Sequence, residues 1–379
     1  MSGRPANGIV VPTRTDGVVT LRAHGEDDIP GALEQCLDPL SQQWTTVPVP
    51  YTLDHAKQFV RHAMPGGWAT DEEWAFAIEA VDPASGEPRF GGTVSLRNEG
   101  EGRAEVAYGS HPWIRGRGYV ERALRVLLEW GFAERDLHTV IWWANQGNWA
   151  SRKVAWRLGF SYDGTVRRWL PQRGELLDGW VGTLLRGEEM VPRNRWLEVP
   201  RIVGERVVLR AHGESDVDRV LEACTDERTV HWLGQLPQPY TRESAEEFVR
   251  NRPEGMARGT DLHWAIADAD TDLLLGVVSL MHIGNGRNDH MAEVGYWAHP
   301  AARGRGVMTE AVRLAARHAF VDEPDGGLGL RRLTGFSAVD NTASRHVLEA
   351  AGFTQFGTER QAILVRDGWH DCAGYELLR

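Results

Sequence analysis

The sequence predicts an α+β fold, within the broad α/β class, built as two tandem domains. Each domain is expected to hold a mixed, mostly antiparallel central sheet flanked by helices. Three observations predict this fold. Sequence blocks recur in the same order about 190 residues apart, strand-like and helix-like segments alternate within each copy, and 379 residues are too many for one ordinary core.

Repeated blocks indicate the duplication directly. LRAHGEDD at 21–28 returns as LRAHGESD at 209–216, and AEVAYGSHP at 104–112 returns as AEVGYWAHP at 292–300. A period this long is unlike that of a solenoid, whose repeats are short. We therefore expect two copies of one domain.

The domains are expected at residues 1–190 and 200–379, with a connector at 191–199. The sequence around Pro192 and Pro200 has neither the 3.6-residue period of a helix nor the 2-residue period of a strand. This pattern favours a semi-extended connector.

Each copy shows the same predicted order of elements. In the first copy we expect a strand at 18–23, a helix from Asp27, a helix at Leu53–His62, strands at Trp74–Ala80, Gly91–Leu96 and Ala104–Ser110, a long helix, a strand at 139–144 and a short helix after Asn148. In the second copy we expect a strand at 206–211, a helix from Ser215, a helix at Arg242–Arg250, strands starting near Trp264, Gly276 and Ala292, a long helix, a strand at 332–339 and a short helix after Asn341.

Two details support this order. Pro112 and Pro300 end the third strand of the inner run, because proline cannot donate to a sheet ladder. Apolar residues of the first long helix fall on one stripe, namely Ala123, Leu124, Leu127, Leu128 and Phe132.

Composition excludes several classes of function. Forty-two Lys and Arg against 53 Asp and Glu give a net charge of −11, which argues against binding the phosphate backbone of nucleic acid and leaves room for a cationic acceptor. No apolar run reaches the roughly 18 residues needed to span a bilayer. Three widely spaced cysteines (Cys36, Cys224 and Cys372) and an N-terminus unlike a signal peptide favour a reducing cytoplasm. No HExxH or Cys/His spacing suggests a metal site.

A glycine-rich turn carries the chemical signal. HPxxRGRG follows the third inner strand in both copies and precedes the long helix. Small residues ahead of a helix let a phosphate approach the free amides, and arginines add charge. The turn is not a P-loop, because no GK[ST] follows. It also differs from GxGxxG, since the third glycine is absent and we expect no βαβ unit around it. The glycines are Gly116, Gly118, Gly304 and Gly306, and the arginines are Arg115, Arg117, Arg303 and Arg305.

With this motif in view, both halves resemble Gcn5-related N-acetyltransferase (GNAT) domains, of the type that acetylates ribosomal-protein N-termini. The family's acetyl-CoA signature is Arg/Gln-x-x-Gly-x-Gly/Ala. It matches Arg115-Gly116-Arg117-Gly118-Tyr119-Val120 and Arg303-Gly304-Arg305-Gly306-Val307-Met308, with Val120 and Met308 where Gly or Ala is usual. The resemblance implies that these loops bind the pyrophosphate of acetyl-CoA.

The resemblance also implies where pantetheine lies. In the family it enters a gap where the sheet splays, which His111 and His299 at the strand ends would border. Asn148 and Asn341, which open the NxxS segments, would contact it. Both asparagines are equally suited to cap a helix, and the two roles are compatible.

For catalysis, the resemblance points to Glu105 and Glu293 as general bases, because the histone-acetylating branch places its base at this strand position. Ordinary strand residues would explain them equally well. The tyrosine acid of many relatives is absent, since Ala155 and Leu348 hold its places. Ser151 and Ser344 are then the expected hydroxyls near sulfur, although either could serve only as a helix-cap hydroxyl.

The expected function is acetyl transfer from acetyl-CoA to a primary amine of a peptide, a protein N-terminus or an amino-bearing small molecule, by direct attack in a ternary complex. Two alternatives stay open. One domain could be a non-catalytic acyl-CoA-binding or scaffold domain, or the chain could be an aminoacyl transferase of related fold. No motif specifies the acceptor or the oligomeric state.

Overall fold

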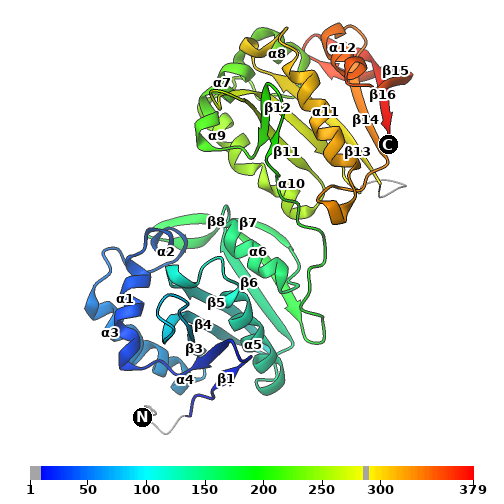
Figure 1. The fold of residues 1–379 in the computed structure, drawn as a ribbon. Helices are drawn as coiled ribbons and strands as arrows, with labels where there is room; N and C mark the ends of the chain where they lie inside the picture. Colours follow the sequence, from blue (N-terminus) through cyan, green and yellow to red (C-terminus); the bar gives the residue numbers. More distant parts are fainter. Residues whose placement is uncertain (1–9, 285–289) are drawn as a thin grey trace. The chain divides into compact units, whose positions relative to one another are not determined.

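The computed structural model describes residues 10–284 and 290–379. Residue contacts divide the chain into two compact units, Met1–Arg193 and Asn194–Arg379. Each unit holds one eight-stranded mixed sheet with helices around it, which confirms the predicted fold class (Figure 1).

The first domain contains the following elements. Its strands are β1 (Arg14–Thr15), β2 (Val19–Arg22), β3 (Glu73–Val81), β4 (Pro88–Gly100), β5 (Arg103–Ser110), β6 (Thr139–Asn145), β7 (Gly164–Gln172) and β8 (Glu175–Leu185). Its α-helices are α1 (Ile29–Leu37), α2 (Pro39–Trp44), α3 (Leu53–Gln58), α4 (Met64–Thr70), α5 (Tyr119–Glu134) and α6 (Trp149–Arg157).

The second domain repeats this order. Its strands are β9 (Ile202–Val203), β10 (Val207–Arg210), β11 (Leu262–Asp268), β12 (Leu274–Met281), β13 (Met291–Ala298), β14 (Arg332–Ala338), β15 (Thr354–Val365) and β16 (Gly368–Leu378). Its α-helices are α7 (Val217–Thr225), α8 (Glu227–Trp232), α9 (Arg242–Asn251), α10 (Pro253–Arg258), α11 (Val307–Phe320) and α12 (Thr342–Ala350). Among the described residues of both domains, no helix combines the length and the apolarity that crossing a membrane requires.

Strand order is the same in both sheets. It runs β1-β2-β3-β4-β5-β6-β8-β7 in the first domain, and the second sheet follows the equivalent order from β9 to β15. All neighbours are antiparallel except β5 with β6 and β13 with β14. Because α5 and α11 connect these parallel pairs, a βαβ unit does surround each glycine loop, and the expectation that none would was wrong.

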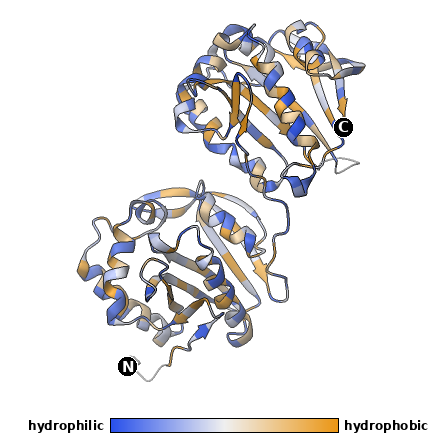
Figure 2. Cartoon of the chain, viewed as in Figure 1, coloured by the Kyte–Doolittle hydropathy of each residue, from blue (hydrophilic) through white to orange (hydrophobic). Residues whose placement is uncertain are grey.

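The sheet of the first domain lies between two groups of helices. Alternation along β3 sends Phe76 and Ile78 into the core beneath α5, and Ala77 into a smaller cluster with α1 and α3. Figure 2 shows the same pattern by hydropathy, with apolar colour concentrated on the central strands. This two-sided burial explains why the inner strands are apolar almost throughout.

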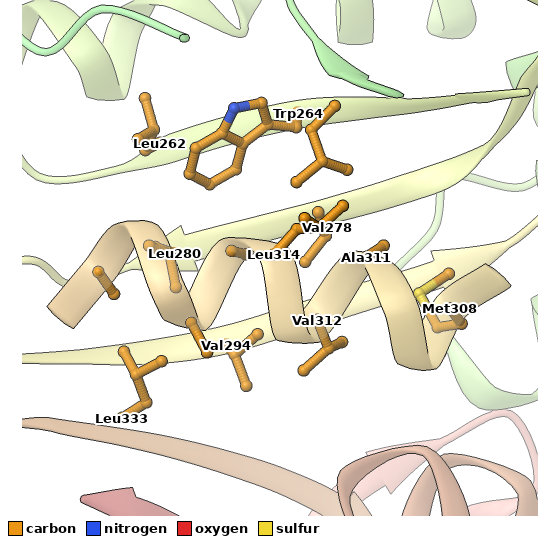
Figure 3. Close-up of a cluster of buried hydrophobic side chains, with 14 of the residues drawn as sticks. Leu262, Trp264, Val278, Leu280, Val294, Met308, Ala311, Val312, Leu314 and Leu333 are labelled. Atoms are coloured by element: carbon orange, nitrogen blue, oxygen red, sulfur yellow. The ribbon is translucent and has the colours of Figure 1, made fainter. Parts of the chain in front are cut away.

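The core of the second domain is built in the same way under α11. Trp264, Val278, Leu280 and Leu314 lie together there, as Figure 3 shows. Met308, in the first turn of α11, is also buried in this cluster. Its bulk therefore points into the core and away from the glycine loop that precedes the helix.

Some segments differ from the sequence prediction. The helix expected at Leu53–His62 ends as α3 at Gln58 and continues through a π-helical turn at Phe59–Ala63 into α4. Residues 167–180 and 359–371, for which the predicted order included no strand, form parts of the β7–β8 and β15–β16 hairpins. Leu197, in the predicted connector, is buried in the second core and donates its backbone N–H to Met256 O.

A largely buried ion pair joins Arg210, the last residue of β10, to Asp216, just before α7, and yields a stability prediction. Arg210 Nη1 lies 2.8 Å from Asp216 Oδ2, and the Asp216 side chain is 2% exposed. Burial alone would raise the pKa of Asp216, but hydrogen bonds from Arg210 and the Gly213 N–H hold it below its usual value.

Asp216→Asn is therefore expected to lower the free energy of unfolding by about 3 kcal/mol, because it leaves a largely buried guanidinium paired only with the exposed Asp272. Urea denaturation followed by tryptophan fluorescence measures the loss, with exposed Asp270→Asn as the control. The Asp216 carboxylate stabilises the fold fully above its unfolded pKa near 3.8. This stabilisation is lost as pH falls through the lower pKa that Asp216 has in the folded protein. A difference that persists at low pH would contradict an ionic origin.

Candidate active site

The glycine loops have the geometry of a backbone anion site. Gly118 adopts φ of +77° and Gly306 of +73° directly before α5 and α11, and no side chain caps either helix. Gly116 and Gly304 also have positive φ, and a Cβ at Gly116, Gly118 or Gly304 would meet nothing within 4 Å. The first helical amides are thus uncapped beside open space, as an anion requires.

Arg115 connects the first loop to a neighbouring helix. Its Nη2 lies 2.7 Å from Asp38 Oδ1 and donates to Ser41 Oγ at 2.9 Å and to the Ser110 carbonyl at 3.0 Å. Asp38 also caps α2 by accepting from the Ser41 N–H. The Arg115 guanidinium is therefore engaged inside the protein, and its contribution to the loop is to brace it.

The second domain repeats this brace. Arg303 pairs with Asp226 and donates to Thr229 Oγ1 at 2.9 Å, while Asp226 caps α8. The hydrogen bond from Arg303 lowers the pKa of Asp226 to about 2. The Asp226 carboxylate therefore stays ionised, and paired with Arg303, at neutral pH.

Both histidines at the strand ends lie under the loops. His111 is 6% exposed and His299 is 4% exposed. Each ring accepts a backbone N–H through Nδ1, and each Nε2 faces a glutamate, Glu34 at 3.0 Å and Glu222 at 2.9 Å. Burial lowers the pKa of both imidazoles. They hold the turn before the loop, and their predicted contact with pantetheine stays a prediction.

The remaining loop residues divide into exposed and packed groups. Arg117 and Arg305 are exposed, and Arg305 reaches Asp268 at 3.3 Å. Tyr119 packs edge-on against Trp113, with ring centroids 5.8 Å apart, and Val120 packs on the first core. Val307 is buried beside Met308. The exposed arginines are the ones placed to meet an incoming anion.

Beside each loop, the two parallel strands separate. The β5–β6 ladder stops at Val106 opposite Trp142, although β5 continues to Ser110. The β13–β14 ladder stops at Glu293 opposite Thr334, although β13 continues to Ala298. The ends of β5 and β13 therefore have no parallel partner on this side, and an extended ligand could pair there as an added strand.

The NxxS segments follow β6 and β14, at the far side of these gaps. Asn148 Oδ1 accepts from the Ser151 N–H at 3.1 Å, and Asn341 Oδ1 accepts from the Ser344 N–H at 3.2 Å. Both asparagines are thus helix N-caps, one of the two roles considered for them.

Tyrosines reach across from the inner strands to the two serines. Tyr108 Oη lies 2.7 Å from Ser151 Oγ, and Tyr296 Oη lies 3.1 Å from Ser344 Oγ. Both serines are partly exposed. The serine hydroxyls therefore border the strand gap, where the sequence resemblance placed the sulfur.

Glu105 is half-buried on β5 and paired with an arginine. Its cross-strand neighbour on β4 is Arg97, whose Nη1 lies 2.9 Å from Glu105 Oε1. Burial raises the pKa of Glu105, and the nearby Arg97 acts in the opposite direction. A carboxylate held by a guanidinium is a weaker base than a free one at the same site.

Glu293, the equivalent residue on β13, lacks this partner. Its cross-strand neighbour is Met281, and within residues 10–284 and 290–379 it makes no ion pair with an arginine or lysine. Burial raises the pKa of Glu293, and His282 acts in the opposite direction. The second domain therefore holds the better-placed candidate base.

Sequence reasoning missed Tyr108, Tyr296 and Arg97. The tyrosines lie inside the repeated AEVAY and AEVGY blocks, so the repetition itself was an available signal. Arg97 gave no such signal, because the second copy has Met281 in its place. Its pairing with Glu105 depends on the register of β4 against β5. In the part of the chain that the structure describes, no three His, Cys, Asp or Glu side chains gather in a way that could hold a metal ion.

Comparison with known proteins finds a match in each of the two domains. The family model for the acetyltransferase (GNAT) domain matches residues 19–161 and 206–354. "Probable N-acetyltransferase YjcK" of Bacillus subtilis is 34% identical over 132 residues, which cover 35% of this chain and 70% of YjcK. The ribosomal-protein-serine acetyltransferase of Escherichia coli is 29% identical over 174 residues, 45% of this chain and 90% of that protein.

A solved structure is also similar. The acetyltransferase of Salmonella typhimurium that modifies the N-terminal serine of ribosomal protein L7/L12 aligns with 47% of this chain and 98% of its own, at 24% identity and a TM-score of 0.40.

The family model and the two named relatives define an acyl-transferring enzyme with two copies of one domain. The chain belongs to the GNAT family and is an N-acetyltransferase. The resemblance seen in the glycine loops is thereby confirmed.

Proposed function

We propose that this enzyme transfers an acetyl group from acetyl-CoA to a primary amine of a peptide, a protein N-terminus or an amino-bearing small molecule, in a ternary complex. One observation carries the proposal. In both domains an uncapped helix N-terminus with an open glycine turn lies at the end of a strand that has lost its parallel neighbour.

The residues present fit acetyl-CoA. The amides that follow Gly118 and Gly306 suit the pyrophosphate, since no side chain caps them, and a Cβ at Gly306 would meet only the Arg206 guanidinium, at 3.0 Å. The exposed Arg117 and Arg305 add positive charge. The unpaired ends of β5 and β13 offer backbone groups to the amides of pantetheine.

Acetyl-CoA, when bound, supplies a thioester whose carbonyl carbon the amine attacks. Glu105 and Glu293 then have the task of taking a proton from the acceptor nitrogen, and their raised pKa values suit this role. Ser151 and Ser344, across the gap, have a hydroxyl that can face the departing sulfur.

The acceptor walls differ between the domains. Glu105 and Trp143 lie on the same face of the first sheet, where Trp143 stacks on the exposed Trp169 at 6.2 Å between ring centroids. In the second domain Phe336 holds the place of Trp143 and meets Phe356 edge-on, whereas Ala362 holds the place of Trp169. The segments 41–52 and 230–241 also differ in sequence. Such differences set which amine fits.

We therefore expect the two domains to prefer different amines. Thiol release from acetyl-CoA is measured for the full chain with either site silenced by Gly118→Glu or Gly306→Glu, against N-terminal serine and alanine peptides, polyamines and aminoglycosides. Identical acceptor profiles at equal rates would contradict the expectation. An absence of amine-dependent thiol release in a chain that binds acetyl-CoA would contradict acetyl transfer to these classes.

A further inference from the structure

The Ser151 hydroxyl is held by side chains from two strands. Trp142 on β6 donates its indole N–H to Ser151 Oγ at 3.0 Å, and Tyr108 on β5 places its hydroxyl oxygen 2.7 Å from the same atom. These are the strands that separate to form the gap, and their ladder ends at Trp142. An indole donor and a phenol hydroxyl therefore converge on one serine oxygen at the place where the gap opens.

Distances rank the two contacts of the tyrosine hydroxyl in the first domain. Tyr108 Oη is 2.7 Å from Ser151 Oγ but 3.3 Å from the Ser151 carbonyl oxygen. Hydrogen bonds between oxygens are usually about 2.7–2.8 Å long, so the contact with Oγ is the stronger of the two, and either oxygen can be its donor. With the phenol as donor, Ser151 Oγ accepts from both Tyr108 and Trp142, and its own proton points away from both.

The second domain has the opposite arrangement. Tyr296 Oη lies 2.8 Å from the Ser344 carbonyl oxygen and 3.1 Å from Ser344 Oγ, so the phenol donates to the carbonyl. Six residues before the capping asparagine, where the first domain has Trp142, the second has Gly335. Ser344 Oγ thus lacks an indole donor, and its proton is satisfied by Tyr296.

We propose that Trp142 and Tyr108 are positioning residues that direct the Ser151 proton toward the sulfur of CoA, and that this device is confined to the first domain. The inference rests on the proposed binding of acetyl-CoA in the strand gap. When the carbon–sulfur bond breaks, the electron pair stays on sulfur, and the directed hydroxyl donates a hydrogen bond to it. The proton that sulfur finally acquires comes from the acceptor amine.

The test needs no acceptor, because CoA itself presents the sulfur. A hydrogen bond to the thiolate lowers the thiol pKa in the complex, so CoA binds more tightly as pH rises, whereas desulfo-CoA lacks the titrating group. Because Gly306→Glu silences the second site, calorimetry on the full chain carrying this substitution measures CoA binding to the first domain. The preference for CoA over desulfo-CoA should rise from about pH 7 to about pH 9.5, across the ordinary thiol pKa near 8.5.

Trp142→Phe should reduce this pH-dependent preference about tenfold, because the Ser151 hydroxyl is then no longer directed at the CoA thiolate. One hydrogen bond to a charged group is worth about this much. Trp180→Phe is the matched control. Trp180 is buried in the same core on the adjacent strand, but its indole N–H has no hydrogen-bond partner. Its substitution should leave the preference unchanged. Tyr108→Phe makes the same test if Trp142→Phe does not fold.

The outcomes separate the two claims. An unchanged preference in a folded Trp142→Phe chain that still binds CoA overturns the positioning role alone. Equal preferences in the two domains, measured with Gly118→Glu for the second, overturn its confinement to the first. Failure of the unsubstituted chain to bind either CoA or desulfo-CoA overturns the proposed function as well.

Discussion

Gly118→Glu is expected to abolish acetyl-CoA binding in the first domain, and Gly306→Glu in the second. A carboxylate at either position would occupy the space and satisfy the amides that the pyrophosphate needs, and it would repel the phosphates. Calorimetry should find two equivalents of acetyl-CoA for the unsubstituted chain, one for each single variant and none for the double variant.

Backbone strain is the competing explanation, because both glycines have positive φ. Gly187 and Gly326 are matched controls, with φ of +87° and +85°, and a Cβ at either would meet nothing within 4 Å. Gly187→Glu and Gly326→Glu impose the same strain and charge and should leave both sites intact. Gly118→Asn should also bind far better than Gly118→Glu, since asparagine tolerates this conformation without a charge. Two equivalents bound by the double variant would show that the loops are only turns.

Glu293→Gln should lower turnover in the second domain by roughly 100- to 10,000-fold while acetyl-CoA affinity stays nearly unchanged, as expected for loss of a general base. Because burial raises the pKa of Glu293, the unsubstituted domain should lose activity as pH falls through this raised value. That acidic limb disappears in the glutamine variant. Rate against pH is measured in a chain whose first site is silenced by Gly118→Glu.

Glu105→Gln should cost less, since Arg97 already competes for the carboxylate. Arg97→Met copies the second domain, where Met281 holds this place, and should move the acidic limb of the first domain to higher pH. Turnover reduced less than about tenfold by both glutamine substitutions would argue against a glutamate base. Asp178 on β8 and Asp371 on β16 are poor alternative candidates for the general base, because each carboxylate already accepts a backbone N–H from a strand bulge.

Much of the fold was predictable from the sequence, for physical reasons. The inner strands and long helices carry strong periodicity, and duplication doubled each signal. The π-helical turn at Phe59–Ala63 was not predictable, because the apolar spacing around Val60 continues through it. The C-terminal hairpins were missed because their exposed residues, such as Trp169, do not alternate clearly. The βαβ unit depends on which strands pair, and local periodicity does not report pairing.

The site was predictable where the backbone makes it. Gly118 and Gly306 stand out in sequence because glycine is the residue that adopts their positive φ most readily. The engagement of Arg115 with Asp38 could not be foreseen, since the two lie far apart along the chain. The different surroundings of Glu105 and Glu293 arise from one cross-strand neighbour each, which only register reveals.

The separation of β5 from β6, and of β13 from β14, has an evolutionary consequence. Main-chain groups at an open strand edge are the same whatever side chains the strand carries, so substitutions there leave the docking edge unchanged. After a gene duplicates, such an edge is inherited complete by both descendants and tolerates drift in each. Side chains on the faces of the sheet have no such protection, as the replacement of Trp143 by Phe336 at equivalent positions shows. One ancestral donor site can in this way come to serve two amines within a single polypeptide.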